Sequence, residues 1–351
     1  MPIDSNSEKK KFVPWQRALQ NVIDKNNHLR QNGRQIASNR TMELRAQVIF
    51  KGFRDLRELG YKIEDPLNFK PKHMTALAMH WEEKGLSSAT IQNQISFFRL
   101  FTQWIGKPGM IGASELYVKA KATVTRHYAA EKDKSWSTNT VDFNEQLVRV
   151  AREDVYVAIQ LRVIHAFGLR LREAVMLRPN SVDKGGYLAI EQGAKNGRAR
   201  ILPIDTEYKR DVIEEARKFA RTPNGHIGNP ELNLAQNQKR FSKIMTKLGL
   251  TQKKLGVTAH GLRHQYINDL LEESTGCKTP VRGGNPEDWK GEKNERAIRN
   301  AMEQAGHLRT SIGKAYYGDT SPPAKSTKGA LPETDGEPAT MEAIAEGSDE
   351  K

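Results

Sequence analysis

The spacing of apolar residues predicts an all-helical first third of the chain. Apolar side chains recur at intervals of three and four, which places them on one face of a helix. Ser87 and Ser88 precede the last of these segments and are suitable N-caps. The four segments are carried by Leu19, Val22 and Ile23; by Leu44, Val48, Phe53, Leu56 and Leu59; by Met74, Leu77, Ala78 and Trp81; and by Ile91, Ile95, Phe98, Phe101 and Ile105. Residues 12–125 are therefore expected to form one helical domain.

The pattern changes in the second half of the chain. A helical stretch over about 141–178 carries a core stripe through Val157, Leu161, Ile164 and Phe167. Two short alternating segments, YLAIEQ at 187–192 and ARILPI at 199–204, are joined by the turn-forming AKNG and predict a β-hairpin. Helices are expected again over 207–220, 236–247, 260–273 and 294–317. The expected fold is mainly α with one small hairpin (α+β), and residues 138–320 form its second domain.

Three segments lack such a pattern. Residues 1–11 are polar and charged, and residues 126–137 read as a charged, irregular linker between the two domains. Residues 321–351 contain four prolines, no aromatic residue, and seven acidic residues against three lysines. Compositions of this kind do not bury enough apolar surface to fold, so we expect a disordered N-terminus and a disordered acidic tail.

The net charge of the chain indicates the kind of molecule that it binds. The net charge is +14, but residues 1–320 carry 53 Lys and Arg against 35 Asp and Glu, a net charge of +18. This surplus favours a nucleic acid over a protein that is merely basic and soluble. The single cysteine excludes an intramolecular disulfide, and neither a signal peptide nor an apolar run of 18 residues is present. We therefore expect a cytoplasmic protein that does not enter a membrane.

Five signals of possible chemistry lie in the second domain. They are Gly168-Leu-Arg-Leu-Arg-Glu173, the hairpin residue Lys195, His260-Gly-Leu-Arg263-His264, Gly306-His307, and Tyr316 nine residues beyond His307. Each alone has an ordinary structural explanation, such as a solvated turn lysine, a histidine cap or a half-buried tyrosine. Taken together and in this order, they resemble the catalytic run of the tyrosine recombinases, the phage-integrase family, over residues 15–318.

The resemblance implies a specific site and activity. Arg170, Lys195, His260, Arg263, His307 and Tyr316 would form the catalytic set, within a catalytic domain that follows a helical core-binding domain. The implied activity is site-specific DNA recombination through a covalent 3′-phosphotyrosyl intermediate, integrating or excising a mobile element. The implied partners are double-stranded DNA recombination sites, three further copies of the chain in a homotetramer on paired sites, and an accessory DNA-bending protein. A bacterial, nucleoid-associated location follows from the same resemblance.

The residue types suit this chemistry independently. Arginine is always charged and binds phosphate oxygens bidentately, which fits Arg170 and Arg263 to a phosphodiester. A phenol with a pKa of about 10 needs help to become a nucleophile. The resemblance gives His260 a proton-transfer role, Lys195 the role of general acid to the leaving 5′ hydroxyl, and His307 a hydrogen bond to the phosphate. Neither an acidic cluster at metal-ligand spacing nor a Walker sequence occurs, so we expect no metal and no cofactor.

Local geometry adds three expectations. Nine positions are two and a half helical turns, so His307 and Tyr316 can converge only if the chain bends, for which Ser311-Ile-Gly313 is suitable. Tyr317 should then pack, and His264 should point away from Arg263. A surplus of residues near 274–296 is either a surface loop or a contact with DNA or a neighbouring protomer.

Two other functions remain open at this level. A type IB-like topoisomerase uses similar residues but relaxes DNA as a monomer, and a non-catalytic DNA-binding protein would need none of them. Retention of all six polar positions favours the recombinase, because a protein that only binds DNA would tolerate losing Tyr316 or Lys195.

Overall fold

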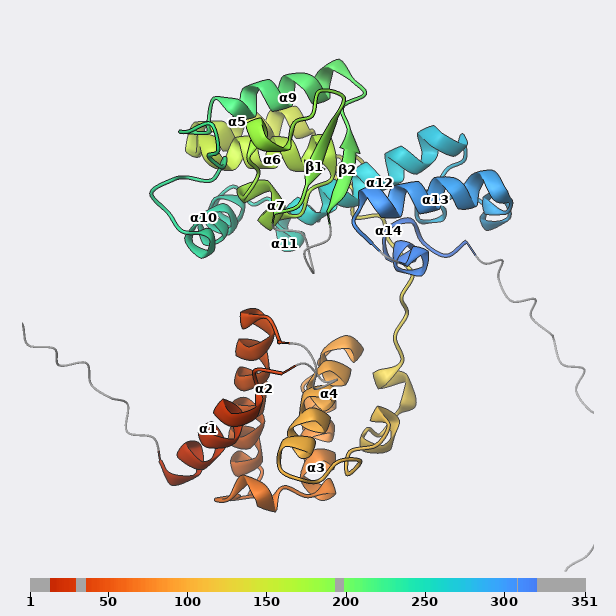
Figure 1. The fold of residues 1–351 in the computed structure, drawn as a ribbon. Helices are drawn as coiled ribbons and strands as arrows, with labels where there is room; N and C mark the ends of the chain where they lie inside the picture. The colour runs from red at the N-terminus through yellow and green to blue at the C-terminus, as the bar shows by residue number, and fades with distance from the viewer. Residues whose placement is uncertain (1–12, 30–35, 193–198, 308, 321–351) are drawn as a thin grey trace, which may run out of the picture. The chain divides into compact units, whose positions relative to one another are not determined.

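A computed structural model describes residues 13–29, 36–192, 199–307 and 309–320. The expected disorder of 1–11 and 321–351, the hairpin tip and Lys195 lie outside the described residues. The chain divides into two compact units, residues 1–127 and 128–351 (Figure 1).

The first unit is built from helices that pack around a cluster of aromatic rings. Ser87 caps the fourth helix by accepting a hydrogen bond from the backbone N–H of Thr90 at 3.3 Å. The ring of Phe53 packs against Phe69 and Phe101 with centroids 6.0 and 5.5 Å apart. The helices are α1 (Pro14–Asn26), α2 (Asn39–Glu58), α3 (Pro71–Glu83) and α4 (Ser88–Trp104), with short 3₁₀ turns at Pro66–Asn68, Ser114–Tyr117 and Lys121–Val124.

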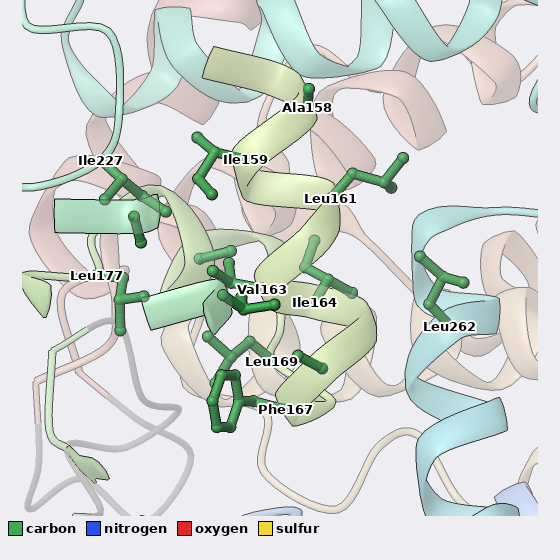
Figure 2. Packing of buried hydrophobic residues seen from close by; sticks show 14 of the residues in the cluster. Ala158, Ile159, Leu161, Val163, Ile164, Phe167, Leu169, Leu177, Ile227 and Leu262 are labelled. Carbon is green, nitrogen blue, oxygen red and sulfur yellow. The ribbon is translucent and has the colours of Figure 1, made fainter. Parts of the chain in front are cut away.

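The second unit is built around α6, which is mostly apolar and has nine of its 13 residues buried. Figure 2 shows its side chains near Leu177 and Ile227, and Leu262 belongs to the same buried cluster. The helices are α5 (Phe143–Glu153), α6 (Val155–Phe167), α7 (Leu171–Val175), α8 (Pro179–Val182), α9 (Glu207–Arg217), α10 (Leu234–Lys247), α11 (Gln252–Leu255), α12 (Ala259–Thr275), α13 (Glu292–Gln304) and α14 (Lys314–Tyr317); 3₁₀ turns occur at Pro280–Arg282, Pro286–Trp289 and Thr310–Gly313.

The predicted hairpin is present. Strands β1 (Tyr187–Ile190) and β2 (Arg200–Pro203) pair antiparallel, with Leu188 opposite Leu202. The expected fold class, mainly α with a small hairpin, is confirmed. Over 294–317 the expected bend near Ser311–Gly313 is present as a 3₁₀ turn before α14, but α13 already ends at Gln304, so the helical stretch is shorter than expected. In the part of the chain that the structure describes, no helix has the length and apolar character to cross a membrane.

Part of the stretch that reads as a linker packs against the second unit. Ser135 and Trp136 are fully buried. The indole N–H of Trp136 donates to the carbonyl of Thr258 at 2.8 Å, and the N–H of Ala130 donates to the carbonyl of Lys314 at 2.8 Å. This segment therefore contacts both the residue that caps α12 and the first residue of α14.

Candidate active site

Arg170 is placed by a glycine that ends the central helix. Gly168 terminates α6 in the left-handed conformation, with φ of 60°, and a Cβ there would lie 2.5 Å from the ring of Tyr266. Only glycine meets both conditions without strain. The chain then turns sharply, so that Arg170 becomes the N-cap of α7.

Glu173 fixes the direction of Arg170. Its carboxylate accepts from the backbone N–H of Arg170 at 2.7 Å and from Nη1 of the same residue at 2.9 Å. Arg200 on β2 donates to both carboxylate oxygens, at 2.9 and 2.6 Å. Burial alone would raise the pKa of Glu173, but the hydrogen bonds and charge of Arg200 and Arg170 hold it below its ordinary value. Glu173 is therefore an anion shared by two cations.

Arg263 is the most deeply buried cation of the site, with 1% of its surface exposed. It projects from the first turns of α12, which begins at the N-cap Thr258. Its Nη1 donates to the carbonyl of Gly168 at 2.6 Å, and its Nη2 donates to the carbonyl of Ala305. These two bonds help to satisfy a buried charge, and they leave Nε directed at the hydroxyl of Tyr316 and Nη2 3.4 Å from Nε2 of His307.

The end of α13 explains the Gly-His pair. Gly306 has φ of 67° and donates to the carbonyl of Glu303, while the N–H of His307 donates to the carbonyl of Met302, both at 2.8 Å. This is a Schellman ending, which requires glycine at its left-handed position. The pair therefore closes α13, and the helix that carries Tyr316 begins only at Lys314.

The carbonyl of Ala305 joins the two arginines. Ala305 caps the C-terminus of α13, where carbonyl groups have no partner within the helix and carry partial negative charge. It accepts from Nη2 of Arg170 at 3.1 Å and from Nη2 of Arg263. One helix end therefore holds both guanidinium groups beside each other.

The hydroxyl of Tyr316 lies among these groups. It is 3.1 Å from Nε2 of His307 and accepts a 3.4 Å hydrogen bond from Nε of Arg263. The bend that makes this possible is the 3₁₀ turn at Thr310–Gly313. The backbone carbonyl of Tyr316 accepts from the fully buried Asn268 at 3.3 Å, which ties α14 to α12.

Two histidines from α12 flank the tyrosine ring. The ring centroid of His264 lies 4.6 Å from that of Tyr316, and the centroid of His260 lies 6.0 Å from it. Burial is the main cause that lowers the pKa of His264 to about 3, and the nearby charges of His260 and Lys134 add to it.

Burial also lowers the pKa of His260, followed by the charges of Arg263, Lys134 and Arg170. Part of His260 is exposed, so solvent limits the size of this effect but not its direction. Both imidazoles are therefore neutral at pH 7.

Tyr317 points into a different environment. It is 2% exposed, and its ring stacks on Trp289 with a centroid distance of 6.2 Å and an interplanar angle of 6°. Burial, reinforced by the charge of Asp319, raises the pKa of Tyr317 to about 12. Its hydroxyl stays protonated and donates to the carbonyl of Thr310 at 3.5 Å, which suits a packing role.

Five of the six expected site residues converge in this way. Arg170, Arg263, His307 and Tyr316 are linked directly or through the Ala305 carbonyl, and His260 lies beside the tyrosine ring. Lys195, the sixth, lies outside the described residues. Within the described ranges no group of three or more His, Cys, Asp and Glu side chains is arranged to hold a metal ion.

Sequence reasoning missed three contributors: Glu173 as the partner of Arg170, Arg200, and the contact of His264 with the tyrosine. A signal existed for Arg200. It alternates with the exposed Ile201 and shares the buried face of β2 with Leu202, and a buried arginine requires an anion. A signal also existed for Glu173, since a glutamate three residues after an N-cap has the spacing of a capping box.

Known protein families match both units of the chain. The family model described as "Phage integrase, N-terminal" matches residues 25–111, and the model described as "Integrase" matches residues 131–269. The tyrosine recombinase XerC of Xanthomonas axonopodis pv. citri is 23% identical over 210 residues, which are 59% of this chain and 66% of that protein. The tyrosine recombinase XerA of Pyrococcus horikoshii is 26% identical over 140 residues, which are 38% of this chain and 47% of that protein. The chain thus spans less than two thirds of the length of these two relatives.

Solved structures share the fold. A lambda integrase dimer bound to a COC′ core site matches with a TM-score of 0.56 and 16% identity, covering 90% of this chain and 99% of that one. A lambda integrase tetramer bound to a Holliday junction matches with a TM-score of 0.57 and 15% identity, covering 90% of this chain and 80% of that one.

Proposed function

Because this chain belongs to the tyrosine recombinase family, we propose that it cuts and rejoins DNA strands at specific sites, with Tyr316 as the nucleophile. The observation that carries the proposal is the hydroxyl of Tyr316, which lies 3.1 Å from His307 and 3.4 Å from Arg263. A tyrosine whose role is only structural has no need of two such groups, each of which can bind a phosphate oxygen.

The proposed reaction exchanges one phosphodiester for another. The oxygen of Tyr316 attacks the scissile phosphorus, a bond forms between them, and the bond from phosphorus to the 5′ oxygen breaks. The phenolic proton leaves to a base, and the 5′ oxygen takes a proton as it departs. No oxidant and no nucleotide is consumed, so the reverse attack by a 5′ hydroxyl rejoins a strand.

The arginines stabilise the charge that builds on the phosphate. Arg170 and Arg263 already lie side by side on the Ala305 carbonyl. Such preorganised donors are worth about 10²–10³-fold in rate each. When DNA binds, the phosphate would take the place that the Tyr316 hydroxyl now shares with Arg263 and His307.

We assign the two proton transfers to His260 and Lys195. We assign the proton of Tyr316 to His260, which its lowered pKa keeps neutral, although the same shift makes it a weaker base. Lys195, on the hairpin, would donate the proton to the leaving 5′ oxygen. His307 would hydrogen-bond the phosphate.

The two units have different proposed roles, DNA binding and catalysis. We assign residues 12–125 to DNA binding and residues 138–320 to catalysis, on either side of 126–137. The net charge of +18 over residues 1–320 supports binding to duplex DNA through its phosphates. Assembly as a homotetramer on paired sites of a mobile element, with an accessory DNA-bending protein, completes the proposal.

Covalent trapping tests the function. The wild-type protein is mixed with fragmented DNA of its source and denatured with SDS, and DNA that remains attached to protein is sequenced. One recurrent cleavage site is expected, and plasmids that carry two copies of it should recombine. An SDS-stable adduct with plasmid relaxation but no recurrent site would indicate a topoisomerase. Binding without any adduct would indicate a non-catalytic DNA-binding protein.

A further inference from the structure

The loop of residues 276–291, between α12 and α13, is folded against the nucleophile helix. The N–H and hydroxyl of Thr279 donate to Glu272 at 2.9 and 3.1 Å, and the indole of Trp289 donates to the carbonyl of Lys278 at 2.9 Å. Trp289 is 3% exposed. A stretch that the sequence left as either a surface loop or an outward contact therefore has its own buried anchor.

This 276–291 loop reaches the residues that follow Tyr316. Trp289 stacks on Tyr317, as described above. A Cβ added at Gly318 would lie 2.8 Å from the backbone nitrogen of Val281 and 3.3 Å from Pro280. The C-terminal end of α14 is thus in van der Waals contact with the loop.

Arg282 fastens the loop to two other elements. Its Nη1 donates to Asp269 and Glu272 on α12, at 2.7 and 3.0 Å. Its Nε donates to Asp133 and its Nη2 to the hydroxyl of Ser135, both at 3.0 Å. The Arg282 side chain is 14% exposed and that of Asp133 is 1% exposed, so this ion pair is screened far less than a surface pair.

The segment held by Arg282 touches both catalytic elements. The carbonyl of Lys134 would lie 2.3 Å from a Cβ at Gly261, between His260 and Arg263, and the N–H of Ala130 donates to Lys314 at the start of α14. The guanidinium of Arg282 therefore joins α12, which carries Arg263, to residues 133–135 directly, and α14 is joined to the same segment through Ala130.

We propose that Arg282 is a positioning residue for the nucleophile: it holds the 276–291 loop and residues 130–135 against α12 and α14 and so keeps the Tyr316 hydroxyl at the reacting phosphate. This proposal rests on the proposed function for its catalytic consequence. A misplacement of about 1 Å can lower a rate by about 10²-fold, so a residue without contact to the reacting atoms can govern the rate.

The first test needs no DNA. Amide hydrogen exchange of residues 309–320 is measured by mass spectrometry in the wild type, Arg282→Ala and Arg282→Lys. Arg240→Ala is the matched control, because Arg240 pairs with the buried Asp154 elsewhere in the same unit. Exchange in 309–320 should rise at least tenfold in Arg282→Ala, less in Arg282→Lys, and not in the control. Unchanged exchange in Arg282→Ala overturns the proposal.

The second test separates positioning from general stability. Adduct formation is measured at saturating DNA on the site recovered by trapping, alongside DNA affinity and the melting temperature. We expect the maximal rate of Arg282→Ala to fall about 10- to 100-fold with affinity within about threefold of wild type. A 5′-bridging phosphorothiolate substrate, whose leaving group needs no proton, should not restore that rate, because the defect lies in the attack.

Each outcome has a distinct meaning. Restoration by the phosphorothiolate, or a wild-type rate despite faster exchange, overturns the positioning role. If Arg282→Ala does not fold, Arg282→Lys decides: a fall of threefold or more at saturating DNA with a native melting temperature supports the role, and a wild-type rate overturns it. If the wild type and Arg240→Ala form no adduct either, the proposed function has failed, and the exchange measurement still decides whether Arg282 holds α14.

Discussion

Nε2 of His307 lies 3.1 Å from the hydroxyl of Tyr316, although nine residues separate them along the chain. A straight helix would put residues nine apart on nearly opposite faces. The Schellman ending of α13 and the 3₁₀ turn at Thr310–Gly313 redirect the chain between them. This contact makes Tyr316, and not its neighbour Tyr317, the expected nucleophile.

Substituting each tyrosine separately tests that assignment. Tyr316→Phe should abolish the SDS-stable adduct, because it removes the only attacking oxygen, while the ring that packs against His264 remains. Tyr317→Phe should retain adduct formation, since its hydroxyl lies in a protein-lined environment with a pKa of about 12. An adduct that survives Tyr316→Phe and disappears in Tyr317→Phe would reverse the assignment.

Replacing Arg170 and replacing Arg263 should have different effects on the stability of the protein. Arg170→Ala should lower adduct formation by about 10²–10³-fold with little loss of stability, because Arg200 still neutralises Glu173. Arg263→Ala should also lower the free energy of unfolding by about 1–3 kcal/mol, because it leaves the buried carbonyl of Gly168 without its donor, whereas the Ala305 carbonyl keeps Arg170.

Adduct assays and urea unfolding measure the two effects. Arg172→Ala, one of the exposed positions of α7, is the matched control and should keep the wild-type adduct rate at saturating DNA. Equal losses of DNA binding and cleavage in Arg170→Ala would contradict a role confined to the reaction.

His264 should make stability depend on pH. Its pKa falls from 6.5 in the unfolded chain to about 3 in the folded protein. Between these values the unfolded state binds the extra proton, so stability is fully present above about pH 6.5 and is lost as the pH falls toward 3.

Urea unfolding between pH 6.5 and 5 measures this effect. His264→Gln should reduce the slope by up to about 1.4 kcal/mol per pH unit. Gln265→Asn, which alters the next residue of α12 without a titrating group, should keep the wild-type slope. An unchanged slope in His264→Gln would show that this imidazole is protonated equally in both states.

DNA affinity should depend steeply on salt. The net charge of +18 over residues 1–320 supports many phosphate contacts, and six to ten such contacts cost about 10³–10⁵ in affinity between 50 and 200 mM salt. Titration of a labelled duplex over this range measures the slope. A slope equivalent to one or two contacts would be inconsistent with a basic surface that follows the DNA backbone.

The local pattern of apolar and polar residues was sufficient to predict most of the helices and the hairpin. The helical period predicted α1 to α4 and the core of α6, and the alternation at 187–192 and 199–204 predicted the hairpin. These features depend on which face of a helix or strand is apolar, and residues close together in the sequence are enough to determine that face. The order of the polar motifs likewise indicated the family before any contact was known.

Long-range contacts were decided only by the tertiary structure. Arg200 and Glu173 are 27 positions apart, and Arg170 and Ala305 are 135 positions apart. The sequence alone did not show that these residues meet, nor which surface covers Tyr317. The fate of 276–291 shows the reason most clearly. Its Gly- and Pro-rich sequence reads as a loop, but Trp289 and Arg282 find buried partners only once α12, α14 and residues 133–135 have come together. Burial of a side chain, and the desolvation that then forces a charge to find its partner, are properties of the assembled chain and not of any one segment.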